Sequence, residues 1–375
     1  MNIMIKLRKI VLVSALIFGV LPGAIAATVT DIAGREVTIP EKADRILLGE
    51  GRLFYALALL EGKKPIDRIV GWQGDFRKLD TQTYAEYKEK FPKIDDIPLI
   101  GNTTADSVSP EKVLTLHPDV AVFGLSGHGP GRNSELVAQL EKAGVPVVFV
   151  DFRTSPLKNT VPSMRILGKV LHREKQAEDY IDFYQTQLKR VTDITGAMPD
   201  KQKPTVFIEL RAASMDECCG SAGKGNMGDF IEQAGGTNVA KNLLPGALGT
   251  VNLEKILAID PKVYIASGGK SPTSAAGPGL MLGAETTAQQ AQESLARVVQ
   301  RNGIDKLSAV KDGRAYGIWH NFYNSPYNIL AIQEMATWFH PQQFAQLDPE
   351  QTMQQLYKQF LAVEPTGTYW TRLKK

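Results

Sequence analysis

The sequence has 375 residues, of which 43% are hydrophobic and 22% are charged. This length and composition allow two compact lobes and exclude a mainly disordered, collagen-like or coiled-coil chain. The net charge is +3, and Lys6, Arg8 and Lys9 supply that surplus in an N-terminal segment without acids. The rest of the chain is formally neutral, which argues against a nucleic-acid-binding protein.

The first 26 residues have the pattern of a secretory signal peptide. An apolar run from Ile10 to Leu21 follows the basic residues, and Ala24-Ile25-Ala26 fits a cleavage site. The run is too short to span a bilayer comfortably, so a retained anchor is disfavoured. No Cys follows the run to accept a lipid. We predict export to a bacterial periplasm, with a mature chain that begins at Ala27 and is not a lipoprotein.

The chain contains two cysteines, Cys218 and Cys219, which are adjacent. A disulfide between adjacent cysteines closes almost no loop, so it stabilises the fold little. Two thiols alone also make a poor structural zinc site. Two half-buried loop residues are the favoured interpretation. A vicinal disulfide that stiffens a binding loop is the alternative.

Strand-like and helix-like segments alternate along the first half of the mature chain, which indicates an α/β lobe with a mostly parallel sheet. Apolar residues then keep helical spacing over 159–195, with a break near 171–173. The predicted elements before this stretch are a hairpin at 28–39, strands at 45–48, 68–72, 120–124 and 145–151, and helices at 54–60 and 134–143.

The second half alternates in the same way after a polar linker at 198–204. Its predicted strands are 205–210, 263–266 and 314–318, and its predicted helices are 228–234, 253–259, 288–301, 325–340 and 349–363. The Gly-, Ser- and Pro-rich stretch 268–283 is predicted to be a mobile loop. The expected organisation is a signal peptide (1–26), a first lobe (27–157), a connecting helical segment (158–197) and a second lobe (198–375).

A repeated segment relates the two predicted lobes. Residues 109–122 align without gaps to residues 252–265, with matching apolar positions and a proline between helix and strand. The copies begin with Ser109 and Asn252, which are favourable N-caps. Two similar lobes joined by a long helix predict two halves that face each other across a cleft.

The order and spacing of several motifs resemble those of class III (cluster A) periplasmic substrate-binding proteins, the receptors of ABC importers for ferric siderophores, haem and cobalamin. The resemblance implies two Rossmann-like α/β lobes with mostly parallel sheets, a long connecting helix and a ligand cleft between the lobes. It also implies a monomer without catalytic residues or an intrinsic cofactor, and a permease dimer with its ATPase as partner. The matching residues are 30–35, 68–71, 109–111, 117–119, 235–240, 252–254 and 309–313.

The same resemblance implies that one exposed glutamate on each lobe docks into an arginine pocket of the permease. The matching positions are Glu111 and Glu254. Two carboxylates far apart on a rigid body orient a partner more than they add affinity. The alternative is that each glutamate only stabilises the start of its helix through the helix dipole. The long connecting helix further implies a limited hinge motion.

Ligand-binding groups are expected on loops at the carboxyl ends of strands. Arg52, Arg77 and Arg211 are candidates for an anionic ligand because guanidinium groups pair with carboxylates and oxyanions. Trp72 and Trp319 are candidates for stacking on an aromatic or macrocyclic ligand. Burial in the core of a lobe is the alternative for the tryptophans.

Three further residues complete the predicted site. Tyr323 can stack on a ligand, His320 and Tyr323 can ligate iron directly, and His128 lies in a glycine-rich loop. A ring of carboxylates for a bare metal ion is not obvious. The favoured cargo is therefore an iron complex in which an organic chelator already holds the metal.

Other functions stay open. The same fold can bind haem or cobalamin, which requires the aromatic loop 319–323 to dominate, or an oxyanion such as molybdate, which requires the arginines. An exported α/β enzyme is the third class, but residues 124–128 fail the G-x-S-x-G pattern at its last position. Residues 223–228 fit G-x-G-x-x-G too far from the preceding strand for a dinucleotide turn, although a helix start there can present N–H groups to an anion.

Overall fold

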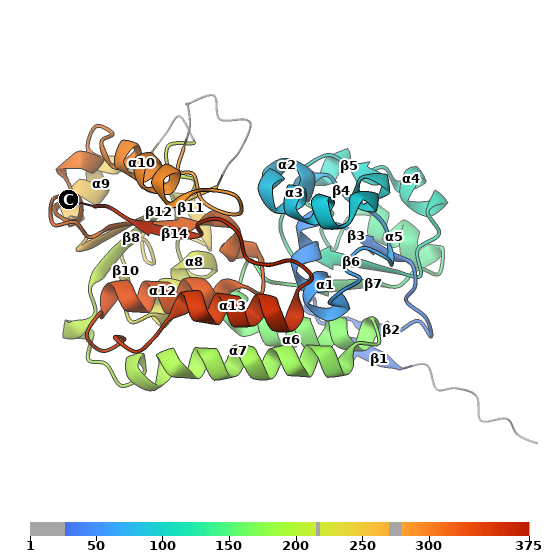
Figure 1. The fold of residues 1–375 in the computed structure, drawn as a ribbon. Coiled ribbons are helices and arrows are strands. Elements are labelled where there is room, and N and C mark those ends of the chain that lie inside the picture. Colours follow the sequence, from blue (N-terminus) through green and yellow to red (C-terminus); the bar gives the residue numbers. More distant parts are fainter. Residues whose placement is uncertain (1–26, 215–217, 270–278, 375) are drawn as a thin grey trace, which may run out of the picture.

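The computed structural model describes residues 27–214, 218–269 and 279–374. The expected signal peptide and most of the predicted mobile loop lie outside these residues. Two α/β lobes stand side by side on a base of helices (Figure 1). No helix within the described ranges is long and apolar enough to cross a membrane.

The first lobe is built on a five-stranded parallel sheet of order β5-β4-β3-β6-β7. Its central strands are short apolar runs because helices and loops bury both faces of the sheet. The strands are β3 (Ile46–Leu48), β4 (Ile69–Gln73), β5 (Leu99–Gly101), β6 (Val120–Gly124) and β7 (Val147–Val150). The helices are α1 (Phe54–Glu61), α2 (Asp75–Leu79), α3 (Thr81–Lys90), α4 (Pro110–Thr115) and α5 (Glu135–Lys142). The predicted hairpin forms from β1 (Thr28–Thr30) and β2 (Glu36–Thr38).

The second lobe has a five-stranded sheet of order β10-β8-β12-β13-β14, in which the edge strand β14 alone among the described strands of this sheet is antiparallel. A short antiparallel ribbon of β9 (Gly220–Ala222) and β11 (Leu248–Thr250) lies beside it. The sheet strands are β8 (Thr205–Glu209), β10 (Thr237–Asn238), β12 (Val263–Gly268), β13 (Ala315–Trp319) and β14 (Trp370–Arg372). The helices are α8 (Asn226–Gln233), α9 (Leu253–Ile259), α10 (Ala288–Val299) and α11 (Ser308–Lys311).

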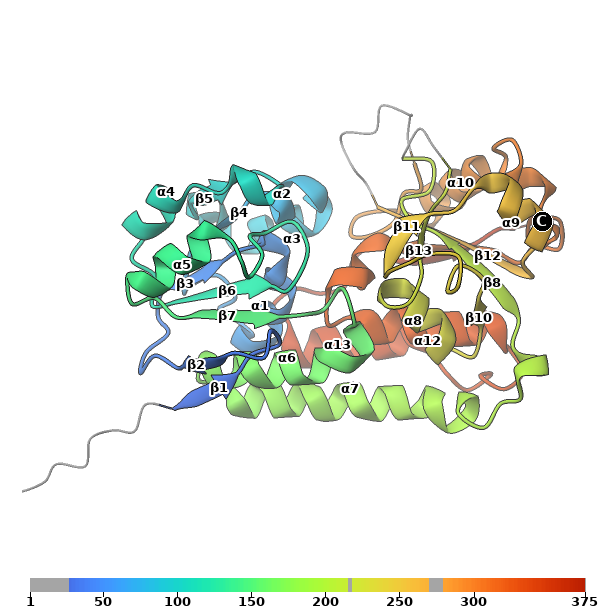
Figure 2. The ribbon, with the colours of Figure 1, turned by 180° about the vertical axis from the view of Figure 1, so that it is seen from behind.

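Four helices form the base that joins the lobes: α6 (Pro156–Val170), α7 (Glu174–Thr195), α12 (Asn328–Phe339) and α13 (Pro349–Phe360). The 22 residues of α7 extend over about 33 Å, and the helix runs beneath both lobes (Figures 1 and 2). Tyr184 Oη donates to Asn328 Oδ1 at 2.9 Å, which fixes α7 to α12 with a buried hydrogen bond. The predicted break near 171–173 is confirmed between α6 and α7.

Both copies of the repeat form a capped helix followed by a parallel strand, as predicted. Ser109 Oγ accepts from the Lys112 N–H at 3.3 Å at the start of α4. Asn252 Oδ1 accepts from the Glu254 N–H at 2.7 Å at the start of α9. Glu111 and Glu254 are exposed on their helices. The predicted fold class, two lobes with mostly parallel sheets joined by a long helix, is confirmed.

Candidate functional site

A cavity of about 320 Å³ lies where the carboxyl ends of the two sheets face each other. Parallel strands bring the loops that follow them to one edge of each sheet, so both lobes contribute to its wall. No carboxylate is among the described residues that line the cavity. The lining residues are His128, Arg153, Leu210, Arg211, Gly220, Ser221, Asn226, Leu248, Gly249, Thr250, His320 and Tyr323.

Four of the eight predicted ligand residues line this cavity, namely His128, Arg211, His320 and Tyr323. The fifth, Arg52, is fully buried one layer behind it. Its Nε donates to Asp75 Oδ2 at 2.9 Å, and its Nη1 donates to Tyr323 Oη at 2.9 Å. Arg52 therefore ties the first lobe to a cavity residue of the second.

Three candidates lie elsewhere and are not brought to the described cavity wall. Trp72 is 1% exposed and packs edge-on against Phe54, with ring centroids 5.7 Å apart. Trp319 is 2% exposed and packs edge-on against Phe322 at 5.1 Å. Arg77 is exposed on α2, outside the cavity. The tryptophans are core residues because their apolar surface is covered by neighbouring rings. No tryptophan is among the described residues that line the cavity, where a large ligand could stack on it.

Hydrogen bonds occupy both ring nitrogens of His320. Arg211 Nε donates to Nε2 at 3.3 Å, so the network assigns the proton to Nδ1, which lies 2.9 Å from Ser267 Oγ. Burial and the Arg211 charge hold the pKa of His320 well below its usual range. The ring is thus neutral and fully engaged, and the geometry does not support the predicted ligation of iron by His320. Tyr323 Oη accepts a hydrogen bond from Arg52 Nη1 at 2.9 Å, and ligation of iron by Tyr323 stays a prediction.

Arg153 is a cavity residue that the sequence interpretation missed. It follows β7, and its guanidinium carbon lies 5.2 Å from the Tyr323 ring centroid. The Arg52 guanidinium lies 5.6 Å from the same centroid. The rule that selected loops at the carboxyl ends of strands applies equally to β7 and would have found it.

The start of α8 holds the loop that carries Arg153. The Asn226 N–H donates to Thr154 O at 3.1 Å, and Asn226 Nδ2 donates to Arg153 O at 2.9 Å. The Gly225 N–H donates to Asp229 Oδ1 at 2.8 Å, and the Gly228 N–H donates to Gly225 O at 3.1 Å. These three backbone N–H groups are engaged within the protein, so they are not available to an anion. The hydrogen bonds from Asn226 instead join the start of α8 in the second lobe to the loop after β7 in the first lobe.

The cavity carries a positive charge at neutral pH. Burial, followed by the Arg52 charge, lowers the pKa of His128 to about 4, so this imidazole is neutral. His128 Nδ1 lies 2.9 Å from Thr103 O, which makes it the donor to that carbonyl. Arg153 and Arg211 are the charged side chains in the described wall. Guanidinium groups in a partly desolvated cavity favour an anionic ligand.

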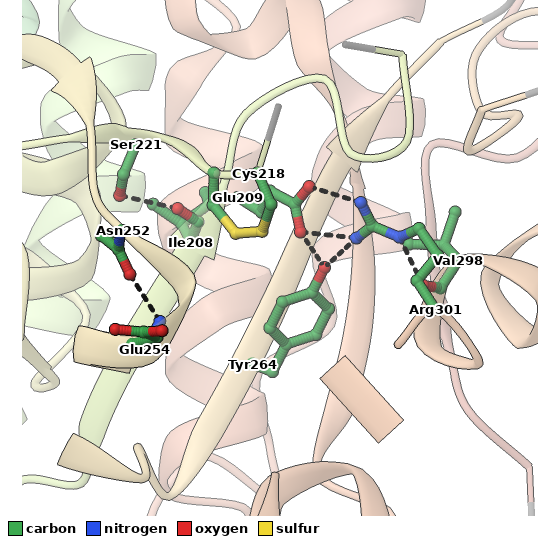
Figure 3. Close-up of a disulfide and its surroundings, with 10 residues drawn as sticks. Ile208, Glu209, Cys218, Ser221, Asn252, Glu254, Tyr264, Val298 and Arg301 are labelled. Carbon is green, nitrogen blue, oxygen red and sulfur yellow. Dashed lines mark hydrogen bonds and ion pairs between the residues drawn. A yellow bond between two sulfur atoms is a disulfide. The ribbon is translucent and has the colours of Figure 1, made fainter. Parts of the chain in front are cut away.

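Cys218 and Cys219 are joined as a vicinal disulfide, the interpretation that the sequence favoured less. Figure 3 shows the disulfide beside the buried Glu209 carboxylate. The Cys219 N–H donates to Val251 O at 3.1 Å, and the Val251 N–H donates to Cys219 O at 2.9 Å. The disulfide thus ends the β9–β11 ribbon, whose residues line the cavity.

Comparison with known proteins agrees with this architecture. The sequence profile of the family described as periplasmic binding protein matches residues 77–320, so the chain belongs to that family. The molybdate-binding protein MolA of Haemophilus influenzae is 23% identical over 376 aligned positions, covering 93% of this chain and 94% of MolA. Family members are substrate-binding proteins of the periplasm that work with a permease and an ATPase, not enzymes.

Solved structures place the chain among class III proteins. The TroA-like periplasmic binding protein FepB from Veillonella parvula superposes with a TM-score of 0.82 and 25% identity, over 92% of this chain and 99% of that one. A periplasmic haem-binding protein from Pseudomonas aeruginosa superposes with a TM-score of 0.56 and 19% identity, over 88% and 98% of the two chains. The latter likeness concerns the fold alone.

Proposed function

We propose that this protein captures a compact anionic iron chelate in the cavity between its lobes and delivers it to an inner-membrane ABC permease. The convergence of Arg153 and Arg211 in a wall without described carboxylates carries this proposal. A volume of about 320 Å³ lies at the small end of the range of ligand sites, about 300–1,000 Å³. This size, and the burial of Trp72 and Trp319 in the core, disfavour haem and cobalamin.

A second candidate cargo is a small oxyanion such as molybdate. The cavity arginines favour it because guanidinium forks match oxyanion geometry. The likeness to MolA over nearly the whole chain adds to it. An oxyanion would bind through the arginines alone and leave part of the cavity to water, whereas a chelate would also contact Tyr323.

Binding calorimetry with the purified protein separates the candidates. Ferric citrate, molybdate and haemin are the probes, and Arg153→Ala and Arg211→Ala are the variants. Each variant removes a charge-assisted hydrogen bond to the anion, so we expect its dissociation constant to rise at least about tenfold. Arg297→Ala removes the same charge from the exposed face of α10 and serves as the matched control.

Each outcome points to one conclusion. Binding of ferric citrate that fails in both cavity variants supports the chelate, and binding of molybdate alone supports the oxyanion. Tight binding of haemin that is indifferent to both arginines would contradict an anion site. An absorbance spectrum of protein isolated from its own periplasm provides an independent check, because a ferric chelate absorbs visible light.

A further inference from the structure

Glu50 is a buried carboxyl group directly behind the cavity wall. It follows β3 and is 1% exposed. The glycine-rich loop 124–129 closes over it at very short range. A Cβ at Gly124 or Gly127 would lie 2.4 Å from Glu50 Oε1, and a Cβ at Gly129 would lie 2.8 Å from Glu50 Cγ. Gly127, with φ of +149°, and Gly129, whose added Cβ would lie 2.6 Å from the Gly49 carbonyl oxygen, leave little room for a side chain where the loop wraps this carboxyl.

The wrapped loop carries a cavity residue, His128. Gln73, from the end of β4, donates through Nε2 to His128 O at 2.9 Å and secures the loop from the other side. The position of this part of the wall thus depends on the Glu50 side chain. Glu50 contributes to the site through the loop and through its charge, and it does not itself line the cavity.

The charged and titratable groups that face Glu50 come from each element around it: Asp75 from α2, Arg52 from the turn after β3, Arg153 from the turn after β7, and His128 from the loop. Three buried atoms of this cluster have no hydrogen-bond partner, namely Glu50 Oε2, Arg52 Nη2 and Arg153 Nη1. Unpartnered buried polar atoms are costly, which makes them candidates for completion by a ligand.

We propose that Glu50 is a positioning residue that exchanges a proton as the anion binds. When ionised, its carboxylate competes with the anion for the Arg52 and Arg153 guanidinium groups. When protonated, it is neutral, so the positive charges of Arg153 in the wall and of Arg52 behind it act on the ligand without a competing carboxylate. Capture of an anion therefore takes up one proton from solvent onto the carboxylate, and loss of that proton favours release. This inference rests on the anionic ligand of the proposed function.

The electrostatic surroundings support an exchange near neutral pH. Burial, followed by the Asp75 carboxylate, raises the pKa of Glu50 to about 7 against the opposing charges of Arg52 and Arg153. A bound anion adds another negative charge and raises this pKa again. Linkage is reciprocal, so the proton strengthens anion binding by the factor by which the anion strengthens proton binding.

The test compares the wild-type protein with Glu50→Gln, a neutral side chain of the same shape. Molybdate and ferric citrate are the probes, and calorimetry is performed from about pH 6 to about pH 8.5 in buffers of different ionisation enthalpy. We expect the wild-type dissociation constant to rise about three- to tenfold over this interval, with uptake of up to about one proton per ligand. The variant should lose the proton uptake, and its profile should be flatter for whichever probe binds.

Glu334→Gln is the matched control. Burial also raises the pKa of Glu334 to about 7, but this residue lies on α12 beside Trp338, in a different cavity of the second lobe. We expect it to keep the wild-type dependence of ligand affinity on pH. Changes in probe speciation with pH affect all three proteins equally and cancel in the comparison.

Thermal melting without ligand provides a second readout. The folded-state pKa of Glu50 lies above the unfolded value, so its stabilising proton is fully bound below about pH 4.5 and lost as the pH rises through about 7. The melting temperature of Glu50→Gln should therefore rise relative to wild type as the pH increases over this range. An unchanged difference would overturn the titration of Glu50.

The outcomes distinguish the inference from the function on which it rests. If both proteins bind a probe with the same pH profile and the same proton uptake, the role of Glu50 is refuted and the anionic ligand stands. If the wild-type protein binds neither probe at any pH, the anionic ligand fails, and this inference fails with it.

Discussion

Each lobe contains a buried arginine–carboxylate centre behind the carboxyl ends of its sheet, but the two centres are completed differently. In the second lobe, Arg301 donates to both oxygens of Glu209 at 2.8 and 2.6 Å, and Tyr264 Oη donates to the same carboxylate at 2.5 Å. In the first lobe, Arg52 meets Asp75 through Nε while its Nη2 has no partner.

This difference separates a centre whose hydrogen bonds are made within its own lobe from one that retains an unpartnered donor. A buried ion pair with its hydrogen bonds made has no donors left for another molecule. An incomplete centre that reaches the neighbouring lobe, as Arg52 does through Tyr323, retains donors and a link to the cavity.

The largest effects are expected from two variants, each of which removes the arginine of one centre. Arg301→Ala leaves the Glu209 carboxylate buried without its partner and should lower the free energy of unfolding by about 3 kcal/mol, with ligand affinity unchanged. Arg52→Met should lower the free energy of unfolding by a similar amount because it leaves the Asp75 carboxylate buried without its charged partner. It should also weaken ligand binding at least about tenfold. Denaturant titration and calorimetry measure the two effects. An equal loss of ligand affinity in both variants would contradict the prediction that only the first-lobe centre contributes to ligand binding.

A smaller effect concerns a feature that both lobes share, the exposed glutamate near the start of the repeated helix. We expect Glu111→Ala and Glu254→Ala each to reduce import by the reconstituted transporter at least about tenfold. Ligand affinity and melting temperature should stay unchanged because both side chains are exposed. Glu135→Ala removes an exposed first-turn glutamate from α5, outside the repeat, and is the control. Reduced ligand affinity in either repeat variant would reject the docking role.

The smallest effect concerns the movement of one lobe against the other. The base helices α6, α7, α12 and α13 connect both lobes, and Tyr180 Oη also donates to Pro326 O at 2.5 Å across α7 and the segment before α12. We expect ligand to change the radius of gyration by less than about 1 Å in small-angle scattering. A large compaction would show that the lobes hinge despite this base.

Most of the fold could be predicted from the sequence because local signals define it. Ser109 and Asn252 cap helices within their own turns, and apolar periodicity outlined the long helices with the break near 171–173. The helices within 75–90 were missed because their sequence is polar and their buried rings, including Tyr84 and Tyr87, have no clear helical stripe. Strand β14 was missed because three residues form it only by pairing with β13.

The site was predicted less completely because strand order indicates which loops meet and not which side chains turn toward the cavity. His128 and Arg211 follow strands and reach it. Trp72 and Trp319 lie at the ends of strands, but their side chains point into the aromatic core. That direction depends on tertiary packing and not on the local sequence. Arg153 could have been found by the same rule, whereas Glu50 gained significance only when the structure revealed its burial and its unpartnered Oε2.

The late position of strand β14 in the sequence affects the order in which the two sheets can be completed. The first-lobe sheet is complete once residue 150 is available, whereas the second-lobe sheet waits for Trp370–Arg372 near the end of the chain. Domains of a chain that emerges from its N-terminus fold in sequence. The first-lobe sheet can therefore form while the rest of the chain is still being made, but the second-lobe sheet is complete only once residue 372 is available.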